Sequence, residues 1–382
     1  MNAKNIFVWS PFTGKVGTVQ NIINCLYSIN KYSKLKTNLI NAFGEWDDYL
    51  DEPKLKNVLV HNFKYLRFIK KWKIRGYLRS RITYSLIFIF SFFPLLNLIK
   101  KNKPDFLVVH LISSLPLTIF SLFNLKTKLI LHIAGHPRLN FFRIIMWKIF
   151  SRNIDKVICP SQELKQVFLD NNIFLADQLK VIEDPHLIIK DINKLKRQDL
   201  RDDFFNSGKI LIAIGRMTKQ KNYSFLIKNF KHLLIKYSDI KLIIIGDGEE
   251  KNNLKKLIKD LNLLNKIKLI DYELNIYKYL KKSNFYISTS IWEGSSLAMV
   301  DAAYVGIPIL CSDCPSGRRE FIDNNERGVL YNQKSNEDFL KSFSYIYSLK
   351  PNEIKKLILN AKKHTRNFTA FKNFLKFSEI LN

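Results

Sequence analysis

The sequence predicts an α/β protein with two doubly wound parallel sheets, one in each half of the chain, that face each other across a cleft. Short apolar runs alternate with segments of helical periodicity along nearly all of the 382 residues, a pattern typical of parallel sheets covered on both faces by helices. The length suits two domains. With 47% hydrophobic residues, the chain can form two large cores and is not a disordered polymer.

The predicted strands are the short apolar runs that lie between the helical segments. In the first half we expect them at residues 5–9, 57–60, 106–111, 129–133, 156–159 and 180–182. In the second half we expect them at residues 210–214, 241–245, 267–270, 285–288 and 308–311. Each half is then a Rossmann-like domain, in which ligands bind beyond the carboxyl ends of the strands.

A change in composition marks the predicted domain boundary. Residues 191–208 lose the apolar periodicity and are rich in charge, as linkers between domains often are. We therefore assign residues 1–190 to an N-terminal domain and residues 209–360 to a C-terminal domain. We expect residues 361–382 to form a helix that packs back on the N-terminal domain.

Positive charge is concentrated in one part of the N-terminal half. The chain has 62 Lys and Arg against 33 Asp and Glu, a formal net charge of +29. Residues 53–154 contain nineteen Lys or Arg and one acidic residue, and so hold +18 of that charge. Such an excess attracts nucleic acid or an anionic membrane. Because no nucleic-acid-binding motif is recognisable, we expect a membrane surface and no nucleic acid.

A charge-free run at residues 82–99 allows three interpretations. It follows a basic amphipathic segment at residues 64–81 and just reaches the length of a transmembrane helix. It also fits a core helix packed against a sheet, or an anchor in the membrane surface with cations at the lipid headgroups. Basic residues flank the run on both sides, which gives no orientation signal and disfavours a span.

The cysteines and the amino terminus indicate a cytoplasmic protein. Four cysteines are too few to stabilise a secreted chain of this size by disulfides. The apolar run at the start of the chain is too short for a signal peptide. Cys311 and Cys314 form a CxxC pattern, but no second pair accompanies them, so we interpret this segment as a loop.

Two groups of residues follow predicted strands and suit an anion. Gly215, Arg216 and Lys221 lie beyond the strand at 210–214. A guanidinium and an ammonium group at the start of a helix can bind separate oxygens of a diphosphate, although a solvated basic turn has the same composition. After the next strand, Gly246 opens a glycine-containing turn that permits close backbone approach.

The most informative pattern begins at Glu293. Gly294, Ser295 and Ser296 open a helix, where backbone N–H groups without partners can bind an anion. Glu293 lies before this helix and Asp301 about two turns along it. The two carboxylates would reach different hydroxyl groups of one elongated ligand. The alternative is that both only cap or solvate the helix.

Together these motifs resemble the retaining glycosyltransferases of family GT4, which have the GT-B fold. The resemblance is close over residues 209–330 and looser before them. Residues 275–280 and 312–320 resemble the subgroup that transfers galactose or N-acetylhexosamines in bacterial surface-glycan assembly. The resemblance implies that the C-terminal domain binds a nucleotide sugar and that residues 1–190 face the acceptor and the membrane surface.

The resemblance also implies roles for four side chains. Arg216 and Lys221 would bind the donor diphosphate and stabilise the leaving nucleoside diphosphate. Glu293 would bind hydroxyl groups of the donor sugar. Asp301 stands where the family usually has a glutamate and would bind the ribose, with a reach shorter by one methylene group.

Further positions would line the donor site, and one histidine would lie near the reacting sugar. The expected donor-binding positions in the C-terminal domain are Gly215, Gly246, Gly294, Ser295, Ser296 and Leu297. Gly17 ends a loop that resembles the family's glycine loop, although the usual double glycine is absent. His132 and His136 both fit the family's histidine. His136 lies past the strand end and is therefore favoured, with a buried structural histidine as the alternative.

The expected function is a retaining transfer of a hexose or N-acetylhexosamine from a UDP-sugar to a lipid-linked oligosaccharide of a bacterial surface polysaccharide. We expect no cofactor and no metal, because no DxD-like cluster follows a strand and Arg216 with Lys221 can replace Mg²⁺. The protein would lie on the inner face of the cytoplasmic membrane. Alternatives are a non-catalytic anion-, lipid- or nucleic-acid-binding protein of the same fold, or a GT-B sugar-nucleotide epimerase or phosphorylase.

Overall fold

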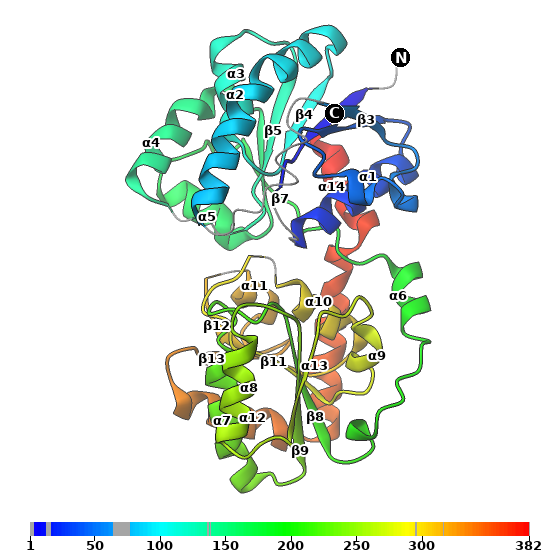
Figure 1. Ribbon diagram of the computed structural model, residues 1–382, viewed down its shortest axis with the longest axis vertical. Helices are drawn as coiled ribbons and strands as arrows, with labels where there is room; N and C mark the ends of the chain where they lie inside the picture. The colour runs from blue at the N-terminus through cyan, green and yellow to red at the C-terminus, as the bar shows by residue number, and fades with distance from the viewer. Residues whose placement is uncertain are drawn as a thin grey trace. The chain divides into compact units, whose positions relative to one another are not determined.

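The chain divides into two compact units (Figure 1). The computed structural model describes residues 4–12, 17–63, 77–135, 137, 139–294, 296–315 and 317–381. Unit 1 comprises Met1–His186 and Ala370–Asn382, and unit 2 comprises Leu187–Thr369. Each unit contains one parallel sheet with helices on both faces, as the alternation of apolar runs and helical segments predicts.

Unit 1 contains a seven-stranded sheet. Its elements are β1 (Asn5–Trp9), α1 (Gly17–Tyr32), β2 (Lys36–Asn41), the 3-10 helices η1 (Asp47–Tyr49) and η2 (Pro53–Leu55), β3 (Leu59–Asn62), α2 (Tyr77–Asn102), β4 (Phe106–Val109), α3 (Ser114–Leu122), β5 (Lys128–His132), α4 (Phe141–Phe150), η4 (Ser151–Asn153), β6 (Lys156–Cys159), α5 (Gln162–Asp170), β7 (Leu179–Val181) and α14 (Ala370–Leu381). The strands run parallel in the order β3-β2-β1-β4-β5-β6-β7.

The two faces of this sheet bury different side chains, because neighbouring residues of a strand point to opposite faces. Phe7 and Trp9 of β1 belong to the core that α2, α3, α4 and α5 cover. Ile6 and Val8 belong to the core on the other face, under α1 and α14. The sheet is therefore covered on both sides, which explains its nearly continuous apolar strands.

Helix α14 belongs to unit 1 although unit 2 precedes it in the sequence. Its residues Phe371 and Phe374 contact the ring of Tyr32 in α1, with centroids 5.0 and 5.7 Å away. The Nζ of Lys376 lies 2.5 Å from a carboxylate oxygen of Glu183. The chain thus returns to complete the core on the α1 face of the first sheet.

Unit 2 contains a six-stranded sheet. Its elements are α6 (Ile189–Leu195), η5 (Asp203–Phe205), β8 (Lys209–Ile214), α7 (Tyr223–Lys236), β9 (Ile240–Ile245), α8 (Lys251–Asp260), β10 (Ile267–Ile270), α9 (Tyr277–Leu280), β11 (Phe285–Ser288), α10 (Leu297–Val305), β12 (Ile309–Asp313), α11 (Arg318–Ile322), β13 (Val329–Asn332), α12 (Asn336–Ser348), α13 (Pro351–His364) and η6 (Thr365–Phe368). The strands run parallel in the order β10-β9-β8-β11-β12-β13.

Two predicted boundaries differ from the observed ones. The expected linker at residues 191–208 lies inside unit 2, where α6 buries Ile192 against the core. The return to unit 1 starts at Ala370 rather than at residue 361, because α13 continues to His364 and buries Ala361 in unit 2. A charged segment can still be helical when a single apolar residue fixes it to a core.

Of the thirteen strands that the structure describes, eleven follow from the apolar runs, with ends shifted by up to two residues. Strands β2 and β13 were not predicted. In β2, the polar residues Thr37, Asn38 and Asn41 are buried, so the strand does not read as an apolar run.

Helix α2 includes the charge-free run of the sequence. Among the described residues, Ile82–Asn102 is the one helical stretch long and apolar enough to cross a membrane. Its residues Ile87, Leu95 and Ile99 are buried in the core of unit 1, so this side of the helix packs on the sheet. Ile89 and Phe93 are exposed on its outer side. Residues 64–76 of the predicted basic segment at 64–81 lie outside the described residues, as do the side chains of residues 77–81.

Both sheets reverse their strand order beside the first strand of the unit. In unit 1 the reversal lies between β1 and β4, and in unit 2 between β8 and β11. Loops that leave the carboxyl ends of two such strands diverge, so a crevice forms where doubly wound proteins bind ligands. In unit 2, Lys221 follows β8 and Glu293 follows β11.

The turn after β9 requires glycine at residue 246. Gly246 has a φ of 151°, and a Cβ at this position would lie 2.0 Å from the carbonyl oxygen of Gly215. Gly246 thus lets the ends of β8 and β9 approach each other. This contact within the protein is a structural function for a residue that the sequence analysis assigned to donor binding.

We predict that Gly246→Ala lowers the free energy of unfolding by at least about 2 kcal/mol, because alanine adds both strain and a backbone clash. Gly17→Ala is the matched control, since no described atom lies within 4 Å of a Cβ at this first residue of α1. Urea unfolding measures both variants. Equal stability of Gly246→Ala and wild type would contradict the prediction.

Candidate functional site

Three loops of unit 2 are joined at the carboxyl ends of β8, β11 and β12. The amide of Ile291 donates a hydrogen bond to the carbonyl oxygen of Gln220 at 2.9 Å. The Gln220 side chain donates to the carbonyl oxygen of Trp292 at 2.7 Å. The amide of Glu293 donates to the carbonyl oxygen of Pro315 at 3.3 Å. The positions of the residues on these loops therefore depend on one another.

A buried carboxylate lies at the centre of these loops. The Oε1 atom of Glu293 accepts hydrogen bonds from Lys221 Nζ at 2.5 Å and from Ser290 Oγ at 2.5 Å. The guanidinium of Arg318 is 3.3 Å from the same oxygen. Two predicted site residues, Lys221 and Glu293, are thus brought together across 72 positions of sequence.

Sequence reasoning missed Arg318, which lies at the first position of α11. Its side chain is only 1% exposed. Its guanidinium donates to Ser296 Oγ at 2.9 Å, to Ser312 Oγ at 2.8 Å and to Ser288 Oγ at 2.7 Å. An arginine that follows a turn is usually on the surface. The residues that allow Arg318 to be buried are serines at three separate places in the sequence, so no local pattern predicts its burial.

The environment of Glu293 favours its ionised form. Burial alone would raise the pKa of this carboxyl group. The positive charges of Lys221 and Arg318 and the hydrogen bond from Ser290 outweigh burial and lower the pKa of Glu293 below its usual value of 4.5. Glu293 is therefore a charged, oriented acceptor at neutral pH.

The absence of a side chain at Gly215 makes room for Lys221. A Cβ at Gly215 would lie 2.6 Å from Cε and 3.0 Å from Nζ of the lysine. Thr289 Oγ1 fixes the backbone here, because it donates to the carbonyl oxygen of Lys221 at 2.8 Å. Arg216, the other predicted diphosphate ligand, has an exposed side chain on the same loop.

Asp301 is buried in α10 and accepts a hydrogen bond from the hydroxyl group of Tyr277 at 2.5 Å. Burial and the neighbouring Asp301 carboxylate raise the pKa of Tyr277 well above its usual value, so the tyrosine remains a donor. The predicted ribose ligand thus has a fixed partner within the protein. Tyr277 was part of the motif at residues 275–280, but its link to Asp301 was not predicted.

The remaining predicted residues lie in different places. Ser296 and Leu297 are at the start of α10, and Gly294 precedes them. Ser295 and His136 lie outside the described residues. Gly17 is the first residue of α1 in unit 1.

The other histidine candidate, His132, is buried in unit 1. Its ring centroid is 4.5 Å from that of His110, and its Nε2 is 3.7 Å from a carboxylate oxygen of Asp184. Burial lowers the pKa of His132, and the negative charge of Asp184 opposes this effect only in part. His132 is thus a buried histidine of unit 1, and the assignment of the family's histidine to His136 stays a prediction.

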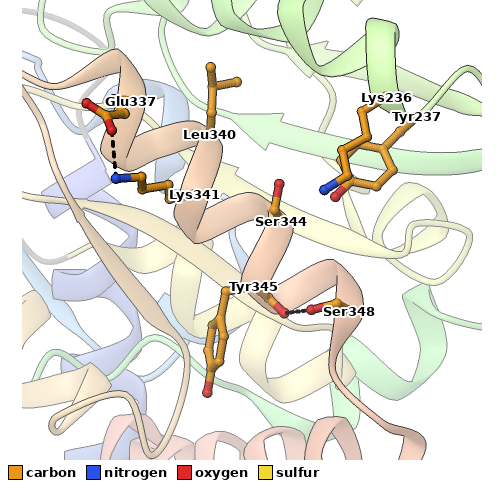
Figure 2. Close-up of a pocket in the computed structure, with 8 residues that line it drawn as sticks. All are labelled: Lys236, Tyr237, Glu337, Leu340, Lys341, Ser344, Tyr345 and Ser348. Carbon is orange, nitrogen blue, oxygen red and sulfur yellow. Dashed lines mark hydrogen bonds and ion pairs between the residues drawn. The ribbon is translucent and has the colours of Figure 1, made fainter.

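A shallow groove lies on unit 2 at the carboxyl-terminal end of α7. Figure 2 shows its lining, with Lys236 and Tyr237 on one side and Glu337, Lys341 and Tyr345 of α12 on the other. Helix α7 has 14 residues and spans about 20 Å, and the Lys221 loop precedes its first turn. The groove is therefore remote from Lys221, Glu293 and Arg318. In the described part of the chain, no three His, Cys, Asp or Glu side chains are grouped so that they could hold a metal ion.

Residues 186–364 match the family model for glycosyl transferases group 1. The match covers slightly less than half of the chain and lies in unit 2 except for His186. It contains the whole Lys221–Glu293–Arg318 cluster, and the match confirms the resemblance to GT4 glycosyltransferases that the motifs predicted.

Two relatives and one solved structure extend the comparison. An uncharacterized glycosyltransferase of Methanocaldococcus jannaschii is 33% identical over 60% of this chain and 61% of the relative. The N-acetylgalactosamine-N,N'-diacetylbacillosaminyl-diphospho-undecaprenol 4-alpha-N-acetylgalactosaminyltransferase of Campylobacter jejuni is 35% identical over 35% of this chain and 36% of the relative. The chain thus aligns with less than two thirds of either relative.

The crystal structure of HepE from Anabaena in complex with UDP has a TM-score of 0.72, with 15% identity over 99% of both chains. This similarity concerns the fold. The two parallel-sheet units together form the GT-B fold, as the motifs predicted.

We predict that ionisation of Glu293 stabilises the folded protein. Because the pKa of Glu293 is lowered on folding, its contribution is complete above about pH 4.5 and is lost as the pH falls through the lower value of the folded state. Urea unfolding between about pH 3 and pH 6 should therefore show a steeper loss of stability in wild type than in Glu293→Gln.

The matched control is Glu337→Gln on α12, because Glu337 pairs with Lys341 at the exposed surface and such pairs contribute little. Its pH profile should follow that of wild type. Parallel profiles for wild type and Glu293→Gln would show that Glu293 is not held in its ionised form.

Proposed function

We propose that the protein is a retaining glycosyltransferase that transfers a hexose or N-acetylhexosamine from a UDP-sugar to a lipid-linked glycan in bacterial surface polysaccharide assembly. The observation that carries the proposal is the cluster of Lys221, Glu293 and Arg318. It places positive charge beside a carboxylate that can accept hydrogen bonds from sugar hydroxyl groups. The cluster lies where the strand order of the doubly wound sheet reverses, between β8 and β11.

The comparisons support the choice of donor and acceptor. HepE, which shares the fold, was crystallised with UDP. The name of the Campylobacter relative specifies a diphospho-undecaprenol acceptor and transfer of N-acetylgalactosamine. A UDP-sugar donor and a lipid-linked acceptor are therefore the first substrates to test.

Charge development explains how these residues would act. Breaking the anomeric bond leaves negative charge on the departing diphosphate, and preorganised positive groups stabilise that charge. Arg216 and Lys221 take this role without a metal ion, together with the backbone N–H groups at the start of α10. Glu293 accepts hydrogen bonds from the hydroxyl groups of the donor sugar. Asp301, beside Tyr277, binds the ribose.

The outer surface of unit 1 supports a peripheral position on the inner face of the cytoplasmic membrane. Helix α4 exposes Phe141, Phe142 and Ile149, and Phe142 is 81% exposed. Helix α2 covers the same face of the sheet and exposes Phe93. Lys148, within α4, is also exposed. Aromatic side chains at the lipid boundary with cations near the headgroups are typical of surface-bound helices.

We predict that Lys221→Ala loses about 2 to 4 kcal/mol of transition-state stabilisation, which lowers kcat about 30- to 1000-fold. The measurement is UDP release from a panel of UDP-sugars in the presence of an undecaprenyl-diphosphate-linked sugar. Lys219→Ala, an exposed cation on the same loop, is the matched control and should retain wild-type turnover. Wild-type turnover in Lys221→Ala would remove this lysine from the mechanism.

We predict that the protein sediments with anionic vesicles at low salt and that added salt weakens the binding. Replacing both Phe141 and Phe142 with serine should weaken binding at least about tenfold, because two large apolar side chains no longer enter the lipid boundary. Tyr345→Ser, an aromatic residue exposed on unit 2, should bind as wild type does. Unchanged binding of the double variant would rule out this surface.

A further inference from the structure

The cluster contains two cations for one carboxylate. Lys221 and Arg318 both contact the Oε1 atom of Glu293, at 2.5 and 3.3 Å. The side chains of Lys221, Glu293 and Arg318 together carry a net charge of +1. One cation can therefore leave while the carboxylate keeps a counter-charge.

The two cations differ in their freedom to move. Arg318 is 1% exposed, and its guanidinium also donates to hydroxyl groups of Ser288, Ser296 and Ser312. Lys221 is 18% exposed, and among the described residues its Nζ donates a hydrogen bond to Glu293 alone. An ammonium group on a flexible stem can change partners, whereas a guanidinium held by several hydrogen bonds keeps its place.

The proposed function requires such an exchange of partners. A diphosphate bound beside Gly215 would attract Lys221 away from Glu293. If Lys221 were the only cation, its departure would leave a buried carboxylate without a counter-charge, which strongly disfavours binding or forces the carboxylate to take up a proton.

We propose that Arg318 is a positioning residue that keeps Glu293 ionised and oriented while Lys221 moves from Glu293 to the diphosphate of the donor. The proposal rests on the proposed function and deepens it, because it divides the two positive charges between two tasks. Lys221 binds the phosphate, and Arg318 keeps the Glu293 carboxylate charged and in place to bind the sugar hydroxyl groups. Through Ser296, Arg318 also holds the start of α10 in the same arrangement.

Proton uptake on binding of UDP tests this division. In Arg318→Met, departure of Lys221 should drive Glu293 to bind a proton, so UDP binding should take up as much as one proton more than in wild type. Isothermal titration calorimetry in two buffers with different ionisation enthalpies measures this number. The affinity of the variant for UDP should then fall by up to about tenfold for each unit of rising pH, relative to wild type. A role limited to packing would change affinity or stability without this proton.

The matched control is Arg319→Met, the next residue of α11, which is 69% exposed and pairs with Asp313. The terminal phosphate of UDP titrates near neutral pH, and it does so equally in the control, so the difference between the two variants isolates Glu293. Arg318→Met/Glu293→Gln should abolish the additional proton. Equal proton uptake by Arg318→Met and Arg319→Met would overturn the proposal.

A second measurement does not require a variant of Arg318. In Lys221→Met, Arg318 is the remaining counter-charge, and NMR titration of carbon-labelled Glu293 should still find this carboxylate ionised at pH 7. A pKa near or above neutrality would overturn the proposal even if Arg318→Met did not fold. If wild type binds neither UDP nor a UDP-sugar, the proposed function and this proposal both fail, whereas binding without the proton difference removes only the role of Arg318.

Discussion

The buried carboxylate of Glu293 is the point on which the arrangement of unit 2 depends. Its charge is stabilised by side chains from the ends of three neighbouring strands, so the loops after β8, β11 and β12 cannot shift independently. A buried charge without such partners would destabilise the fold. The same contacts that satisfy the carboxylate also arrange a cation and an acceptor beside the switch point.

The strand order makes these contacts geometrically possible. Lys221 and Glu293 are far apart in the sequence, but β8 and β11 are adjacent in the sheet, so their carboxyl ends meet. Gly246 allows the neighbouring turn to close against Gly215. Gly246 thus permits a close approach of two backbone segments. The hydroxyl groups of three serines accept hydrogen bonds from the buried guanidinium of Arg318. Each local choice agrees with the global fold.

The sequence predicted the features that depend on periodicity and strand ends. Apolar runs gave most strands, and the residues just beyond two of them gave Lys221 and Glu293 as site residues. Strand β2 was not predicted because its buried asparagines and threonine give a polar segment that is typical of a loop. The burial of Arg318 and the Tyr277–Asp301 contact were not predicted for another reason. Side-chain contacts between separate elements depend on packing, which neither composition nor spacing reveals.

The return of α14 makes unit 2 an insertion within unit 1. Phe377 and Leu381 occupy the core beneath β1, so unit 1 completes this core only after α14 has emerged from the ribosome. Unit 2 is one continuous stretch and meets no such delay. A fragment of unit 1 made by simple truncation would expose an apolar groove, whereas a fusion that rejoins residue 186 to residue 370 would retain the missing helix.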